Sequence, residues 1–412
     1  MFSLNETTRK GLVSGSYAPG FEGLARQFTH NFNELDEVGA SVCVRVSGET
    51  VVDLWGGQAK LKSGEPWHED TLSVVYSCTK AATALCAHIL VDRSLLELNQ
   101  LVSNYWSEFS ANGKEKVTVL MLLNHSAGVP AFKKPLKDGA YYDWQYMTKR
   151  LAAEAPFWEP GTRNGYHMTT FGWTVGELVR RVSGQSLGSF FKTEVADPLG
   201  IEFWIGLPES EEHRVAPMIN YRAKARAPKS DFLKALLREK NSIPHLAFHN
   251  SGGHLANSRQ AHAAEIGAAG GITNARGLSG MYVPLAAGGE FEGQQFLRPE
   301  TVVRMNEVSV ATQRDATLLV PTRFTPGFMK SIDNRNAAPE NSDSVLLGTR
   351  AFGHVGAGGS IGFADPECNL AFGYTMNQMG PGVFLNERGQ SLVDASYRCL
   401  GYSNNIGGVW VK

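Results

Sequence analysis

The chain has 412 residues, of which 42% are apolar and 19% charged, and its formal net charge is −1. This composition is that of a globular protein and excludes a disordered chain. The length suffices for one large two-lobed domain or for two domains. The 39 basic and 40 acidic residues form no long block of one sign, so no nucleic-acid partner is indicated.

The start of the chain and its cysteines indicate a cytoplasmic protein. Residues 1–6 lack the basic and then apolar stretches of a secretory signal. No apolar run approaches the ~18 residues that span a bilayer. The five cysteines are odd in number, widely spaced and free of any C-x-x-C pair. We therefore expect reduced thiols, a cytoplasmic location and no membrane span.

Hydrophobic spacing predicts several element types in the first quarter of the chain. Apolar residues at intervals of three and four within residues 1–37 predict a leading helix. Alternating residues on both sides of a Ser-Gly-Glu turn predict a β-hairpin over residues 38–59. A further helix is predicted from Ser77 through Leu90.

The middle of the chain has a helical pattern and the end returns to strands. Residues 80–290 are mostly helical in spacing. Within them, residues 208–262 are rich in charge, proline and histidine, which predicts a long surface excursion beside the active site. Strands are predicted at 359–365 and 370–376.

This order of strands, helices and strands is typical of an α/β (α+β) protein with an inserted helical lobe. We expect residues 1–75 and 291–412 to form one α/β lobe around a single sheet. Residues 76–290 are expected to form the helical lobe. The two lobes would make one catalytic domain with the active site at their interface.

A Ser-x-x-Lys motif, which can hold a nucleophile and its base, occurs twice, at Ser77…Lys80 and Ser189…Lys192. Such a short motif also arises by chance, as a serine at a helix start and an exposed lysine. Ser77 follows an apolar strand-like run and precedes an alanine-rich helix, whose free N–H groups favour an oxyanion. Lys80 shares a helical face with Ser77, and apolar surroundings would lower its pKa. Ser189 lies within an ordinary helical segment.

Two further motifs follow. A Pro-Gly turn leads into Tyr166, and a tyrosine near a lysine ammonium can act as a general base. Taken alone, the Tyr166 motif is more typical of a half-buried aromatic residue with a satisfied hydroxyl. Later, His354-Val355-Gly356 opens a glycine-rich strand edge that lets the backbone approach a substrate.

In this order, the three motifs resemble those of the serine β-lactamase and penicillin-binding protein superfamily. The resemblance is greatest to class C β-lactamases and family VIII carboxylesterases, and it runs from about residue 38 to about residue 400. It implies a β-lactamase/transpeptidase-like fold with an antiparallel sheet flanked by helices. It also implies that Ser77, Lys80 and Tyr166 are catalytic, with Tyr166 or Lys80 as the principal base. The N–H groups of Ser77 and Ala357 would form the oxyanion hole.

Two departures from the β-lactamase pattern favour esters. His354 stands where Lys-Thr-Gly has the lysine that binds the β-lactam carboxylate. Met168 stands where the tyrosine motif has an asparagine. The resemblance therefore implies a serine carboxylesterase that hydrolyses short- to medium-chain esters through an acyl-enzyme. The expected substrate-binding residues are His354, Gly356, His167 and Trp158.

Other functions stay open at this point. A β-lactamase, a D-Ala-D-Ala peptidase or a transesterase could use the same fold, and so could a non-catalytic scaffold. Ser360 lies in a G-x-S-x-G sequence, but a strand is expected after it and no histidine follows His354 to complete a triad. No metal spacing and no nucleotide motif occurs, so no metal and no cofactor is expected. The expected partner is a small ester, and the oligomeric state is not readable.

Overall fold

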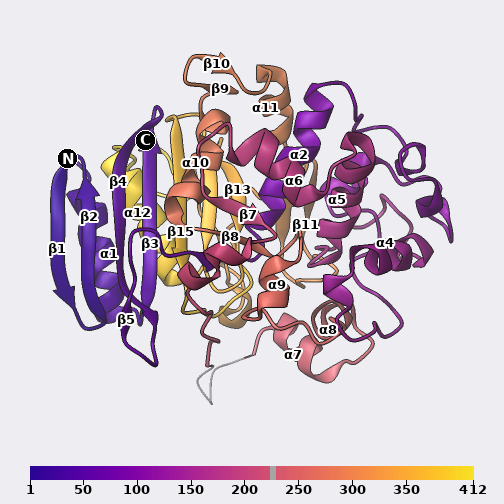
Figure 1. Ribbon diagram of the computed structural model, residues 1–412, viewed down its shortest axis with the longest axis horizontal. Helices are drawn as coiled ribbons and strands as arrows, with labels where there is room; N and C mark the ends of the chain where they lie inside the picture. The colour runs from indigo at the N-terminus through magenta and orange to yellow at the C-terminus, as the bar shows by residue number, and fades with distance from the viewer. Residues whose placement is uncertain (223–228) are drawn as a thin grey trace.

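The structure, a computed structural model, describes residues 1–222 and 229–412. Its centre is an antiparallel sheet built from both ends of the chain (Figure 1). The strands lie in the order β1 (Phe2–Thr8), β2 (Gly11–Tyr17), β4 (Glu49–Lys60), β3 (Gly39–Val46), β15 (Leu370–Met376), β14 (Ile361–Asp365) and β13 (Phe352–Val355), and β5 (Glu65–Pro66) pairs with β4. The predicted antiparallel sheet, the predicted hairpin and the two predicted late strands are confirmed.

The prediction of a helix over residues 1–37 is wrong for its first half. Residues 2–17 form the β1–β2 hairpin, and β2 adds to β4 at the sheet edge. Most side chains of β1 are exposed, so this edge strand carries little of the hydrophobic alternation on which a strand prediction depends. The helical spacing belongs only to α1 (Glu22–Glu34), which buries Leu24, Phe28 and Phe32.

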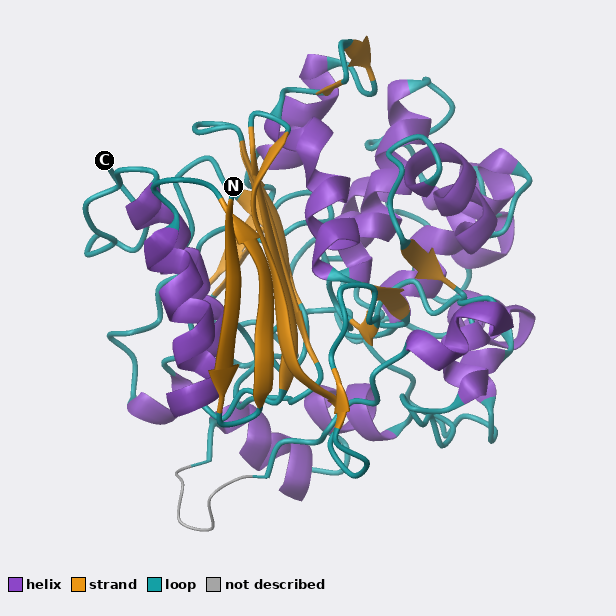
Figure 2. Ribbon diagram, turned by 60° about the vertical axis from the view of Figure 1, so that its left-hand side comes forward, coloured by secondary structure: helices purple, strands orange, loops and turns teal. Residues whose placement is uncertain are grey.

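Helices cover both faces of the sheet (Figure 2). On one face, α1 packs against α12 (Glu387–Cys399), and on the other face lies α10 (Ala275–Ala286). The α10 side chains approach the sheet so closely that a Cβ on Gly362 would lie 2.6 Å from the Tyr282 ring. Helix α10 falls within residues 76–290, which were expected to form the helical lobe. It packs on the sheet instead, because nearly all its residues are apolar and buried. The lobe limits at residues 75 and 291 stay predictions.

The second lobe is helical and packs around α2 (Thr79–Asp92), of which all residues but the last are buried. Around it lie α3 (Val119–Leu123), α4 (Trp144–Ala153), α5 (Thr170–Ser183), α6 (Leu187–Phe191) and a π-helical turn (Lys192–Ala196). A small sheet of β6 (Ser73–Val74), β8 (Gly271–Thr273) and β7 (Phe203–Ile205) connects to the start of α2. Figure 1 shows this small sheet between the large sheet and the helical lobe.

In the described part of the excursion over residues 208–262, a 3-10 helix (Glu209–Arg214) is followed by three short α-helices. These are α7 (Asp231–Arg238), α8 (Ile243–His249) and α9 (Arg259–Ala263). Each begins after a serine whose side chain accepts a backbone N–H, namely Ser230, Ser242 and Ser258. The weak hydrophobic periodicity of this segment did not predict these helices, although their capping serines can be found in the sequence. The part of the predicted excursion at 223–228 lies outside the described residues.

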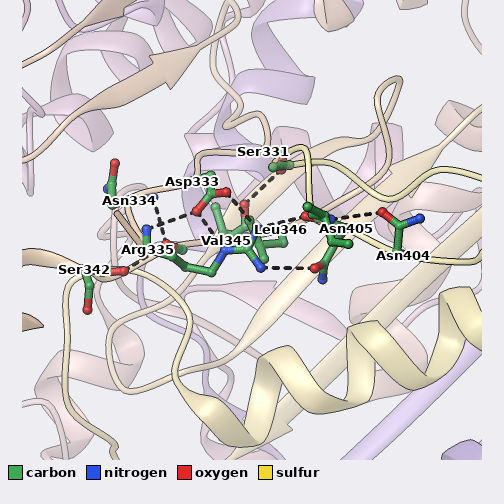
Figure 3. A network of polar contacts seen from close by, with 12 residues as sticks. Ser331, Asp333, Asn334, Arg335, Ser342, Val345, Leu346, Asn404 and Asn405 are labelled. Carbon is green, nitrogen blue, oxygen red and sulfur yellow. Dashed lines mark hydrogen bonds and ion pairs between the residues drawn. The ribbon is translucent and has the colours of Figure 1, made fainter. Parts of the chain in front are cut away.

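The second lobe is followed by the short hairpin of β9 (Glu290–Phe291) and β10 (Gln294–Gln295), and then by loops that contain α11 (Pro299–Asn306), β11 (Val310–Thr312) and β12 (Thr322–Phe324). The C-terminal segment of the chain lies on these loops. Figure 3 shows its polar network. Arg335 pairs with Asp333 and donates to the side chain and carbonyl of Asn405 at 3.1 and 2.8 Å. The Ser331 hydroxyl donates to the carbonyl of Gly408 at 2.8 Å. This network ties down the end of the chain.

Two findings bear on the expected location. Among the helices of residues 1–222 and 229–412, none is long and apolar enough to cross a membrane. All five cysteines are free thiols. The cytoplasmic location expected from the sequence stays a prediction.

Candidate active site

Ser77 lies where a strand turns sharply into a helix. Strand β6 ends at Val74, Tyr76 has a left-handed backbone with φ of 42°, and α2 begins at Thr79. A left-handed non-glycine residue is strained, and such strain is concentrated at functional sites. The turn leaves Ser77 partly exposed beside the N-terminus of α2, where N–H groups favour negative charge.

Lys80 lies one helical turn beyond Ser77 and is completely buried. Its Nζ lies 3.2 Å from Ser77 Oγ, 2.7 Å from the carbonyl oxygen of Met168 and 2.9 Å from that of Ala268. Burial holds the pKa of Lys80 well below its usual value. A neutral amine has two N–H groups, which the two carbonyls accept, and its lone pair then faces the Ser77 hydroxyl. This geometry would allow a lysine amine to accept the proton of a serine hydroxyl.

Tyr166 lies against both groups. The Lys80 Nζ is 4.6 Å from the centre of the Tyr166 ring, and the ring stacks on Phe324 at 5.8 Å with planes 10° apart. The Tyr166 N–H donates to both carboxylate oxygens of Asp315, at 2.9 and 3.0 Å. Burial raises the pKa of Tyr166 above its usual value, and a hydrogen bond with Ser77 offsets only part of this effect. The hydroxyl is therefore a phenol at neutral pH.

The turn after β13 presents backbone to the same place. A Cβ on Gly356 would lie 2.3 Å from the carbonyl oxygen of Val75, so only glycine allows this turn to approach the strand that precedes Ser77. Ala357 follows in the turn and is exposed. Within the described part of the chain, the N–H groups of Ser77 and Ala357 have no hydrogen-bond partner. They are therefore free to hold an oxyanion.

The histidines predicted to bind substrate lie in two different settings. His354 is buried with its ring 6.0 Å from that of Tyr166. Its Nδ1 lies 2.7 Å from the Val355 carbonyl, and its Nε2 has no partner among the described residues. His167 is fully buried, with Nε2 accepting the Val129 N–H at 3.1 Å and Nδ1 lying 2.7 Å from the Gly165 carbonyl. His167 therefore holds the turn before Tyr166, while His354 keeps one nitrogen free.

Burial lowers the pKa of His354 to about 3, and Lys80 contributes to the shift. Burial also lowers the pKa of His167 to about 3. Both rings are therefore uncharged at neutral pH, and neither carries the permanent positive charge that a lysine in its place would carry.

Trp158 supports the turn from the outside. Its indole N–H donates to the Ser126 carbonyl at 3.2 Å, and a Cβ on Gly165 would lie 2.6 Å from its ring. The ring is half-buried beside His167. Trp158 thus shapes the loop that carries Tyr166.

Ser360 has a structural environment. It is buried, its hydroxyl donates to the Val75 carbonyl at 3.2 Å, and its nearest thiol is that of Cys78 at 3.7 Å. These contacts fasten the glycine-rich turn to the strand that leads to Ser77. Ser360 follows a turn and precedes β14, so it lacks the helix of a nucleophile elbow.

A cavity of about 800 Å³ lies elsewhere, between α4, α5 and residues 263–265. Tyr141, Tyr142 and Trp144 line it, whereas neither Ser77 nor Lys80 does. The aromatic residues of this part of the helical lobe thus surround a hollow separate from the nucleophile.

Sequence reasoning missed the groups that hold the catalytic side chains. The Met168 carbonyl belongs to the tyrosine motif, but its contact with Lys80 is made by backbone, and the Ala268 carbonyl comes from a loop that no motif marks. Asp315 occurs in an Asp-x-Thr sequence typical of a turn, yet its contact with Tyr166 spans 149 positions. No local pattern could have found that contact.

The fold and the site define a serine hydrolase in which a serine at a helix start is paired with a lysine one turn later. The sequence profile of the beta-lactamase family matches residues 25–396. The chain therefore belongs to the beta-lactamase family, as the sequence motifs predicted.

Individual relatives agree with this assignment. The chain is 33% identical to the "Esterase/beta-lactamase LipL" of Mycobacterium tuberculosis, over 92% of this chain and 86% of that protein. The crystal structure of a family VIII carboxylesterase is similar with a TM-score of 0.82 and 37% identity, covering 94% of this chain and 99% of that chain. A penicillin-binding protein homologue from Caulobacter crescentus has a TM-score of 0.83 and 31% identity, with coverage of 94% and 99%. The predicted fold class and family are confirmed.

Proposed function

We propose that this protein is a carboxylesterase that hydrolyses short- to medium-chain esters through an acyl-enzyme on Ser77. The observation that carries the proposal is the buried Lys80 amine, 3.2 Å from Ser77 Oγ, with two carbonyls in place to accept its N–H groups. Relatives described as a family VIII carboxylesterase and as an esterase/beta-lactamase support the class of substrate.

Lys80 is the base in this proposal. Its lone pair takes the proton of the Ser77 hydroxyl, and Ser77 Oγ forms a bond to the ester carbonyl carbon. The carbonyl oxygen becomes an oxyanion, which the N–H groups of Ser77 and Ala357 stabilise. Tyr166 is unsuited to be the first base, because its raised pKa keeps it protonated.

Tyr166 then acts as the acid. As the carbon–oxygen bond of the tetrahedral intermediate breaks, the Tyr166 phenol gives its proton to the departing alkoxide and recovers one from the Lys80 ammonium. The products of this half are an alcohol and the Ser77 ester. Water, deprotonated by the same groups, hydrolyses that ester and restores Ser77.

The ester preference rests on His354. A β-lactam carries a carboxylate, which a lysine at this position would pair with, whereas a buried neutral imidazole cannot form an ion pair. In this proposal the neutral His354 ring lies behind the site, with a buried Nε2 that has no partner among the described residues, and Gly356 lets the backbone approach an uncharged substrate. Trp158 and His167 shape the loop beside it. Because one relative is described as both esterase and β-lactamase, β-lactam hydrolysis is the second candidate.

One comparison of substrates tests the proposal. Purified protein is given p-nitrophenyl esters of increasing acyl length and, separately, a chromogenic cephalosporin. We expect turnover of the short and medium esters to exceed that of the cephalosporin, and Ser77→Ala to abolish ester turnover. Ser189→Ala is the matched control with unchanged rate.

Other results would redirect the assignment. Cephalosporin turnover above that of every ester would make the chain a β-lactamase. Ester exchange in place of hydrolysis, when an alcohol is added, would make it a transesterase. Absence of all turnover together with an unreactive Ser77 would leave a non-catalytic scaffold.

A further inference from the structure

An isolated carboxylate is buried directly behind Tyr166. Asp315 lies in the loop between β11 and β12, is 0% exposed, and makes no ion pair within the described residues. Besides both contacts with the Tyr166 N–H, its Oδ1 accepts the N–H groups of Thr317 and Leu318 at 2.8 and 2.9 Å. Burying a carboxylate without a cation is costly unless donors surround it. To hold its own turn, the loop would need only the contacts of Asp315 with the Thr317 and Leu318 N–H groups.

The loop of Asp315 holds Tyr166 at several points. The Ala316 N–H donates to the Asn164 carbonyl at 3.0 Å, and the Thr322 hydroxyl donates to the Asn164 side chain at 3.1 Å. At its far end the loop enters β12, which supplies the Phe324 ring stacked on Tyr166. One segment thus fixes both the backbone and the ring of the tyrosine.

Among the residues that the structure describes, Asp315 is also the carboxyl group that affects the pKa of Tyr166. The other titratable groups that face the tyrosine are an amine, a thiol and three imidazoles, namely Lys80, Cys78, His125, His167 and His354. Burial lowers the pKa of all three histidines, so they are neutral. Burial is the largest influence on Asp315 and raises its pKa, while three N–H donors and the Thr322 hydroxyl offset part of that effect by favouring the carboxylate form. A nearby negative charge opposes formation of a phenolate.

We propose that Asp315 is a positioning residue for Tyr166. Its carboxylate fixes the Tyr166 backbone, and its negative charge keeps the phenol in the form that donates a proton to the leaving alcohol. This inference rests on the proposed esterase function. It assigns to the loop between β11 and β12 a part in catalysis without contact with the substrate.

The test is Asp315→Asn, which keeps the size and one acceptor oxygen but removes the charge. Two esters with the same acyl group, p-nitrophenyl butyrate and ethyl butyrate, are compared across pH. We expect the alkaline limb of kcat/KM that the phenol sets to move to lower pH, because the phenol ionises more easily without the neighbouring negative charge. We also expect ethyl butyrate to lose about tenfold more activity than p-nitrophenyl butyrate, since ethoxide needs a proton to leave.

Asp365→Asn is the matched control. Asp365 is equally buried and accepts the Tyr397 hydroxyl at 2.7 Å, on the side of the sheet near α12. This variant is expected to leave the alkaline limb and the ratio of the two esters unchanged. Equal losses for both esters in Asp315→Asn, with an unmoved limb, would show a purely structural role and overturn the proposal.

A second measurement follows the phenol itself. In protein with ¹³C-labelled tyrosine, the Tyr166 resonance is assigned by its absence from Tyr166→Phe. A resonance that titrates at lower pH in Asp315→Asn than in the wild type supports the proposal, and one that behaves identically across pH in both proteins overturns it. If the wild type hydrolyses neither ester, the esterase function fails, whereas wild-type activity with an unmoved limb removes only the role of Asp315.

Discussion

Two regions of this molecule carry the same four-residue pattern in opposite surroundings. At the start of α2, Lys80 is buried and its Nζ contacts two carbonyls and Ser77 Oγ. At α6, Ser189 is exposed, and the Lys192 side chain is 58% exposed and paired with Asp197 at 2.6 Å. Lys192 therefore lies in solvent, whereas Lys80 does not.

The difference leads us to expect that burial, and not spacing alone, makes a Ser-x-x-Lys pair reactive. A lysine can accept the serine proton only if its ammonium form is destabilised. Burial does so at Lys80, whereas the Lys192 side chain is exposed to solvent and paired with Asp197. The second pair is thus an internal control for the first.

The largest effect is expected when the buried lysine loses its amine. Lys80→Met should reduce kcat/KM for p-nitrophenyl butyrate by at least ~10³-fold, because Ser77 loses its base. Lys192→Met, the matched variant, should leave the rate unchanged. Steady-state kinetics on both proteins measures the contrast, and comparable losses in the two would break the comparison.

Removing the phenol hydroxyl should have the next largest effect. Tyr166→Phe keeps the ring stacked on Phe324 and removes only the proton donor. We expect a loss of ~10²–10³-fold with ethyl butyrate and a smaller loss with p-nitrophenyl butyrate. Ethyl butyrate hydrolysis at the wild-type rate would exclude Tyr166 as the acid.

The proposed oxyanion hole gives a third prediction. Ala357→Pro removes one N–H, and kcat should fall by about 10²-fold with little change in KM. Ala357→Ser keeps the N–H and serves as the control, with circular dichroism to check the fold. A proline variant as active as the serine variant would exclude Ala357 as a donor.

The pH dependence should reveal the base directly. Lys80 must be neutral to accept the proton, so kcat/KM should fall about tenfold per pH unit below the Lys80 pKa. Because burial lowers that pKa, activity should persist at pH values well below the usual lysine pKa, where an ordinary lysine is already protonated. The histidines near the site, with pKa values lowered by burial, should add no second step near neutral pH. Activity confined to pH values above about 10 would contradict the role of burial.

The smallest effect is expected at Ser360. Ser360→Ala removes a hydrogen bond to the Val75 carbonyl and should lower stability by about 1 kcal/mol. Ester turnover should stay within about threefold of wild type, since the turn remains in place. Thermal unfolding and kinetics measure both quantities. Loss of activity as large as that of Ser77→Ala would transfer the nucleophile role to Ser360.

Much of this architecture could be predicted from the sequence because it depends on local patterns. The hairpin of β3 and β4, strand β15 and helix α5 have strong alternation or helical spacing. The edge hairpin of β1 and β2 could not be predicted, because exposed strands owe their conformation to pairing with β4.

The site divides in the same way. Ser77, Lys80 and Tyr166 carry motifs, whereas the Met168 and Ala268 carbonyls that hold Lys80 act through backbone, which any residue supplies. Asp315 and Phe324 reach Tyr166 only after the chain has folded over more than a hundred positions. Such long-range contacts produce no residue spacing that a sequence motif could reveal.

The most direct test of the nucleophile is covalent labelling of the folded protein. After reaction with a fluorophosphonate probe, the protein is digested and its peptides are identified by mass spectrometry. The account predicts one adduct on Ser77, which Lys80→Met greatly slows and Lys192→Met leaves unchanged. An adduct on Ser189 or Ser360, with Ser77 unmodified, would contradict it.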